Sequence, residues 1–117
     1  MNPAKKIENA IHNEDFLSAF SHAVTYFELF GFVILRKKLR GKISGDKLEK
    51  LSVHTIIILL CALEIIEQPT YNTMMAVKTV RNKIIHPEKG IMYEPNDEEK
   101  RAISKSVECV EELLEKI

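Results

Sequence analysis

The stretch that decides the fold runs from Asn13 to Gly41, NEDFLSAFSHAVTYFELFGFVILRKKLRG. Its large apolar residues recur at spacings of three and four, which places them along one face of a helix. This stripe consists of Phe16, Phe20, Ala23, Phe27, Phe30 and Ile34. Asn13 is expected to cap the helix, with Glu14 and Asp15 in an acidic first turn. Basic residues followed by Gly41 suit its carboxyl end, so the stretch predicts one long amphipathic helix.

One helix is expected before this one and another after it. Pro3–His12 predicts a short first helix, since proline is tolerated in a first turn. After a short segment, Lys47–Leu51, Ser52 is expected to cap a helix from Val53 to Glu67. That helix is apolar nearly all round and is therefore expected at the centre of the fold.

The second half of the chain also predicts helices. Pro69 is expected to break the preceding helix, and a new helix should run from Tyr71 to Ile85. It should stop there because His86 precedes a proline. A loop is expected over residues 88–95, and a last helix should follow, in which Asn96 and Glu99 resemble a capping box.

No segment alternates between apolar and polar residues as a half-buried strand does. The sequence therefore predicts an all-α fold, an antiparallel helical bundle of four to five helices. At 117 residues the chain is expected to form a single domain over residues 1–117.

Composition narrows the function classes. The 45% of apolar and 29% of charged residues are typical of a globular protein, and the formal net charge is zero. A charge of zero gives no general prediction of nucleic-acid binding, although a local basic surface would remain compatible with it. The basic run over residues 36–42 could contact phosphates, but a solvated helix end is favoured. Cys61 and Cys109 lack a second cluster of ligands, so no metal and no cofactor are expected.

The ends and the apolar runs bear on location. Residues 1–9 contain no apolar core of the signal-peptide kind. The longest apolar run, Thr55–Leu63, is too short to span a bilayer. We therefore expect a cytoplasmic protein with no membrane association.

One arginine stands out on the helix expected over residues 71–85. With Met74 at zero and 100° per residue, Val77, Val80 and Ile84 fall between about 240° and 300°. Arg81 falls at about 340°, inside the apolar arc. A guanidinium on an apolar surface is costly unless it binds an anion or lines a pocket. Arg81 is therefore expected to have a partner.

His86 and Asn82 complete a candidate constellation with Arg81. Because proline ends the helix, His86 can turn back toward Arg81, and the Asn82 amide can orient either side chain. An arginine that is always charged, beside a histidine that titrates near neutrality, suits phosphodiester chemistry without metal. The histidine would move a proton, and the arginine would stabilise the charge that develops on the phosphate.

The stretch from Arg81 to His86, RNKIIH, resembles the R-x4–6-H signature of the HEPN superfamily. The resemblance implies a small helical bundle, commonly a homodimer, that acts on RNA as a metal-independent endonuclease or as a binding protein. Such proteins serve in toxin–antitoxin, antiviral or RNA-processing systems. Arg81 and His86 would be the catalytic pair, and Asn82 matches the polar residue that often follows the arginine. The implied reaction is attack of a ribose 2′-hydroxyl on the adjacent phosphate.

The same residues could instead have purely structural roles. Glu28, on the flank of the long helix, or Glu64 could form an internal salt bridge with Arg81, and such a supporting carboxylate could also orient it. His86 could cap the helix end by binding a backbone carbonyl, and Asn82 could be a surface amide.

Two further hypotheses do not need RNA cleavage. The chain could be a catalytically silent helical interaction module, for example the dimerising partner of a nucleotidyltransferase-type protein. It could also be a bundle that senses a ligand by holding a nucleotide phosphate on Arg81.

Overall fold

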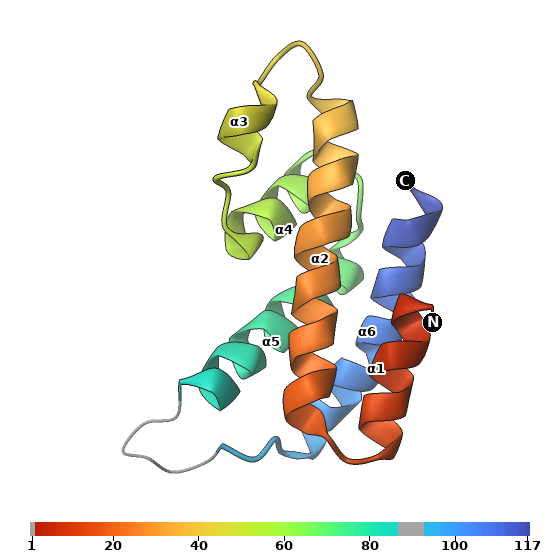
Figure 1. Cartoon of the computed structure of the whole chain (residues 1–117). Helices are drawn as coiled ribbons and strands as arrows, with labels where there is room; N and C mark the ends of the chain where they lie inside the picture. Colours follow the sequence, from red (N-terminus) through yellow and green to blue (C-terminus); the bar gives the residue numbers. More distant parts are fainter. Residues whose placement is uncertain (1, 87–92) are drawn as a thin grey trace.

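The computed structural model describes residues 2–86 and 93–117, and in these ranges it contains six helices and no strand. The all-α prediction is confirmed, and the helices form a bundle (Figure 1). They are α1 (Pro3–His12), α2 (Phe16–Lys38), α3 (Gly45–Leu48), α4 (Val53–Ala62), α5 (Gln68–Ile85) and α6 (Asp97–Glu115). In Figure 1, α2 and α6 run in one direction, and α1 and α5 run in the other.

The long helix α2 is the centre of the bundle. It packs against all five other helices, with α1, α4, α5 and α6 as its main neighbours. The predicted stripe explains why, because its middle is fully enclosed: Phe20, Ala23 and Phe27 have no exposed surface. Phe16 and Phe30, toward the ends of the stripe, are half-buried. An apolar face this long offers enough surface to bury several partner helices.

The prediction that the helix beginning at Val53 lies at the centre is wrong. α4 packs mainly against α2 and α5 and lies to one side of the bundle (Figure 1). It buries one face, whereas Ile58 on its other side is 39% exposed. An all-apolar composition therefore did not indicate central burial here. The contact with α2 is close at Gly31, where an added Cβ would lie 2.5 Å from Cγ2 of Ile56.

Three predicted helix boundaries are wrong, namely the end of α4 and the starts of α5 and α2. α4 ends at Ala62 rather than Glu67, because Glu64 takes a left-handed conformation with φ 58°. The N–H groups of Ile65 and Ile66 then bond back to the carbonyl of Leu60, which closes the helix end.

Pro69 does not break a helix but lies in the first turn of α5, where its missing N–H costs nothing. At the start of α2 the cap is Asp15 and not Asn13. Asp15 accepts bonds from the N–H and the hydroxyl of Ser18, whereas Asn13 ends α1 and Glu14 between them has φ 56°.

Several local predictions are confirmed. α1 has the predicted bounds, Ser52 accepts a bond from the N–H of Thr55, and α5 ends at Ile85. Asn96 and Glu99 form a complete capping box at the start of α6. Residues 93–95 of the predicted loop are not helical, and its residues 88–92 lie outside the described ranges.

Candidate functional site

Arg81 lies on the last turns of α5, at the edge of the face that packs into the bundle. It is half-buried, while Val77 and Val80 beside it are buried. Its Nε donates a hydrogen bond of 3.0 Å to Oδ1 of Asn82, the next residue. Among the described residues nothing else accepts a hydrogen bond from the Arg81 side chain. The two terminal amino groups of the guanidinium therefore have no protein partner in the described part of the chain.

The structure does not pair Arg81 with an internal carboxylate. Within residues 2–86 and 93–117 the ion pairs are Lys5–Glu8 and Lys83–Glu99, both at 3.7 Å. Glu28 is exposed on α2. The side-chain partner that the structure supplies is Asn82. The role of Glu28 as a supporting carboxylate stays a prediction.

His86 is the residue at which α5 ends. Its backbone has left the helical region, with φ −128° and ψ 63°, and its N–H still bonds to the carbonyl of Asn82 at 3.1 Å. The side chain is exposed and makes no hydrogen bond to a described residue. The backbone bond thus ties His86 to Asn82, whose side chain holds Arg81, while the imidazole is open to solvent. Pro87, which was expected to force this helix end, lies outside the described residues.

A cluster that sequence reasoning did not connect with the site lies beside these residues. The hydroxyl of Tyr93 lies 2.6 Å from both carboxylate oxygens of Glu99 and donates to them. Lys83 forms its ion pair with the same carboxylate, and its Nζ lies 5.4 Å from the centre of the Tyr93 ring. Oε1 of Glu99 also accepts the N–H of Asn96 at 2.9 Å. The capping-box pattern identified Glu99, but no sequence pattern linked it to Lys83 and Tyr93.

The electrostatics of this cluster are consistent with the contacts. Burial raises the pKa of the Glu99 carboxyl, but the hydrogen bonds from Tyr93 and Asn96 and the charge of Lys83 outweigh it and give a lowered pKa. The hydrogen bond to Glu99 raises the pKa of Tyr93, and burial and the carboxylate charge add to this effect. At neutral pH the cluster therefore holds a carboxylate and a neutral phenol.

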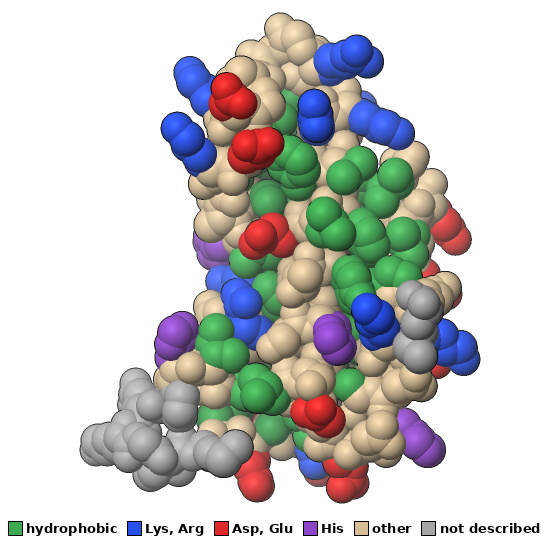
Figure 2. All heavy atoms as spheres, viewed as in Figure 1, with side chains coloured by type: hydrophobic (Ala, Val, Ile, Leu, Met, Phe, Trp, Pro, Cys, Tyr) green, Lys and Arg blue, Asp and Glu red, His purple; other side chains and the backbone are tan. Residues whose placement is uncertain are grey.

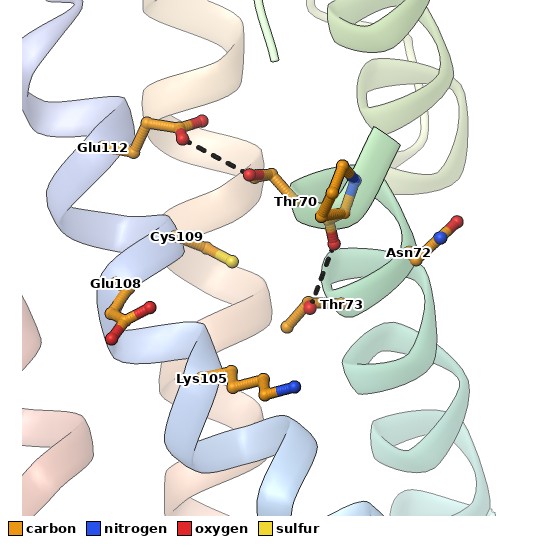
Figure 3. Close-up of a pocket in the computed structure, with 8 residues that line it drawn as sticks. Thr70, Asn72, Thr73, Lys105, Glu108, Cys109 and Glu112 are labelled. Atoms are coloured by element: carbon orange, nitrogen blue, oxygen red, sulfur yellow. Dashed lines mark hydrogen bonds between the residues drawn. The ribbon is translucent and has the colours of Figure 1, made fainter. Parts of the chain in front are cut away.

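Two hollows lie near α5 and α6. Figure 3 shows the first, of about 390 Å³, between the start of α5 and the middle of α6. There Thr70 donates to Glu112 at 3.3 Å, while the other oxygen of Glu112 is buried without a described partner. Burial raises the pKa of the Cys109 thiol in its wall to about 12. That buried oxygen is out of contact with solvent, so a molecule entering the hollow would not reach it.

The second hollow, of about 410 Å³, is lined by the α1–α2 turn, Ile84, Tyr93 and Lys100. It borders the Tyr93 cluster described above. Arg81 and His86 line neither hollow.

An apolar strip runs along one side of α2. His22, Tyr26 and Phe30 stack in sequence, with ring centres 6.4 and 5.5 Å apart. Leu29 on the same side of the helix is 51% exposed. In the view of Figure 2, apolar side chains gather over the middle of the molecule. We call Tyr26, Leu29 and Phe30 the α2 strip.

Among the described residues, no group of three or more His, Cys, Asp or Glu side chains could hold a metal ion. Of the helices in the described ranges, α2 alone is long and apolar enough to cross a membrane by length and composition. The central helix of a bundle meets the same criterion, and α2 has that position here.

The basic run over residues 36–42 lies on the surface at the end of α2 and in the turn that follows, and its role stays a prediction. All five of its cations are exposed, and Lys37 donates to the carbonyl of the last residue, Ile117, at 3.1 Å. This bond ties the end of the chain to α2.

The fold and the site define an all-α helical bundle in which a half-buried arginine and an exposed asparagine and histidine lie at the end of one helix. Comparisons of the chain with family models, with curated proteins and with solved structures found no match.

Proposed function

We propose that this chain is a HEPN-like RNA-binding protein in which Arg81, Asn82 and His86 form a metal-independent endoribonuclease site. The observation that carries the proposal is the bond from Arg81 Nε to Asn82 Oδ1. It uses one donor of the guanidinium and fixes the plane of the group. The two terminal amino groups have no described partner and can bind two oxygens of one phosphate, as arginine does in bidentate contacts.

His86 supplies the proton chemistry in this proposal. Its exposed imidazole accepts the proton of the ribose 2′-hydroxyl, and the 2′-oxygen attacks the adjacent phosphorus. A bond forms between the 2′-oxygen and phosphorus, and the bond from phosphorus to the 5′-oxygen breaks. The leaving 5′-oxygen takes a proton from the His86 imidazolium or from water. The products are a 2′,3′-cyclic phosphate and a 5′-hydroxyl, and Arg81 stabilises the charge on the phosphate during attack.

Cleavage of an end-labelled single-stranded RNA in excess EDTA tests the proposal through Arg81. Arg81→Ala should reduce the cleavage rate about a hundredfold or more, as loss of a transition-state charge partner does. Arg81→Lys keeps the charge but loses the planar fork and should recover only part of the rate. The matched control is Arg101→Ala, because Arg101 is an exposed arginine on α6. Equal rates for the Arg81→Ala and Arg101→Ala variants would refute the assignment.

The resemblance extends the proposal to a toxin–antitoxin, antiviral or RNA-processing role. A chain that cuts cellular RNA should arrest growth when it is expressed alone, and His86→Ala should relieve the arrest at equal protein level. Growth arrest that persists in His86→Ala would rule out RNA cleavage as its cause.

A second candidate function is that of a silent interaction module, and the α2 strip favours it. An exposed leucine beside two stacked aromatic rings is the kind of surface that subunits cover. A homodimer or a complex with a nucleotidyltransferase-type protein would fit this reading. Light scattering gives the mass of the assembly. A module without activity predicts a dimer or complex that Leu29→Asp weakens and a chain that leaves RNA intact in EDTA.

A further inference from the structure

The end of α5 that carries the proposed site is thinly buried. Val80 is its last buried residue, and Ile85 in the final turn is 39% exposed. Asn82 and His86 are both exposed. Ile84 packs against the core but is only half-buried, and a helix end with few buried residues opens easily unless other contacts hold it. Precise placement of Arg81 and His86 therefore needs a contact outside the core.

Glu99 supplies this contact. Its side chain is only 13% exposed and has three partners, namely the hydroxyl of Tyr93, the N–H of Asn96 and the ammonium of Lys83. Lys83 belongs to the last turn of α5, between Asn82 and His86. Tyr93 lies on the other side of His86 in the chain. One carboxylate at the start of α6 thus binds residues that precede and follow His86.

We propose that Glu99, with Lys83 and Tyr93, is a positioning group that fixes the last turn of α5 and so holds His86 in place relative to Arg81. This inference rests on the proposed function. The carboxylate is suited to the task because its capping-box bond to Asn96 holds it at the start of α6. Errors of about 1 Å in the placement of a reacting group can reduce a rate about a hundredfold, so a loosened turn would slow cleavage without removing a group that touches RNA.

Three variants separate positioning from stability and from RNA binding. Glu99→Gln keeps an oxygen for the N–H of Asn96, because glutamine also completes a capping box, but loses the charge that binds Lys83. Tyr93→Phe removes the hydroxyl and keeps the ring. Lys83→Arg keeps the charge and is expected to retain activity. The matched control is Glu8→Gln, which breaks the other ion pair of the described residues, Lys5–Glu8 on α1.

Steady-state cleavage and hydrogen exchange are measured on the full chain. Glu99→Gln and Tyr93→Phe should each lower kcat about tenfold, with KM changed less than about twofold. Exchange of the amides of Ile84, Ile85 and His86 should become faster in both variants, while exchange in the middle of α2 stays unchanged. Glu8→Gln should match the wild type in both measurements, and Lys83→Arg, which keeps the charge, should depart from the wild type less than Glu99→Gln does.

The outcomes separate this inference from the proposed function. If the wild type does not cleave RNA, the proposed function fails, and exchange of the α5 end still tests the positioning contact. Unchanged exchange at the α5 end in Glu99→Gln would overturn the inference whether or not the chain cleaves RNA. An unchanged kcat, or a rise in KM alone, in a chain that cleaves would also overturn it, the latter because it would mark the group as an RNA contact.

Discussion

Arg81 donates from Nε to the side-chain oxygen of Asn82 at 3.0 Å, and this short bond between neighbours is the organising contact of the candidate site. The backbone carbonyl of Asn82 accepts the N–H of His86 at 3.1 Å. Asn82 therefore contacts both members of the proposed catalytic pair, one through its amide and the other through its backbone.

Substitution of Asn82 tests this relationship. Asn82→Ala leaves the guanidinium unoriented and should lower the cleavage rate about tenfold, since an arginine without a fixed plane binds phosphate less specifically. Asn82→Asp would form an ion pair with Arg81 that competes with phosphate, and it should weaken RNA binding more than alanine does. Fluorescence anisotropy of a labelled RNA measures the binding. Stronger binding by Asn82→Asp than by Asn82→Ala would contradict the assigned role of Asn82.

The Tyr93–Glu99 contact should stabilise the fold over a defined range of pH. Glu99 has a pKa below its ordinary 4.5, so its contribution is complete above about that pH and is lost as the pH falls through the lowered value. Tyr93 has a pKa above its ordinary 10.0, so its contribution is complete below that pH and is lost as the pH rises through the raised value.

Thermal unfolding of the wild type and Tyr93→Phe across pH measures this contribution. The difference in Tm between the two proteins should be constant between about pH 5 and 10 and should shrink on both sides. A difference that is the same at pH 3 as at pH 7 would show that the carboxylate is not the partner.

The two cysteines should differ sharply in reactivity. Because burial raises the pKa of Cys109 to about 12, its thiolate is scarce at neutral pH, and its side chain is also shielded. Cys61 is half-buried. Alkylation at pH 7.5, read by peptide mass spectrometry, should label Cys61 first and Cys109 only after denaturation. Equal labelling of both thiols in the folded protein would contradict the packing of α6 against α5.

Gly31 should be required for the contact between α2 and α4. In Gly31→Ala the new Cβ would lie 2.5 Å from Cγ2 of Ile56, a β-branched side chain that cannot rotate away freely. Overpacking costs about 1–3 kcal/mol, and alanine recovers about 1 kcal/mol of helix propensity, so the variant should be less stable. Urea unfolding measures the change. The control is Gly45→Ala, which meets only Arg36 Nε at 4.0 Å; a Gly31→Ala variant as stable as this control would be inconsistent with the close contact.

The features that the sequence predicted correctly depend on residues that are close together in the chain. The capping box of Asn96 and Glu99, the cap at Ser52 and the stripe centred on Phe20 and Phe27 depend on neighbours in the chain or in one helix. The early end of α4 depends on the left-handed conformation of Glu64, which is uncommon outside glycine. No propensity of a glutamate indicates that conformation.

The candidate site was predicted only in part, because some of its contacts depend on how separate helices pack. The periodicity placed Arg81 inside an apolar arc, and the structure has it half-buried at the edge of the packed face. Its Asn82 partner lies within one turn, whereas the cluster of Lys83, Tyr93 and Glu99 joins the end of one helix to the start of another. Such contacts follow from how helices pack and from loop geometry, which a single sequence pattern does not specify.

The single-turnover rate of RNA cleavage in EDTA by the wild type, His86→Ala and His12→Ala tests the central claim most directly. His12, an exposed histidine at the end of α1, is the matched control. The account predicts that the wild type and His12→Ala cleave at the same rate and leave cyclic phosphate ends, while His86→Ala is slower by about a hundredfold or more. Cleavage by His86→Ala at the wild-type rate, or no cleavage by the wild type, would contradict it.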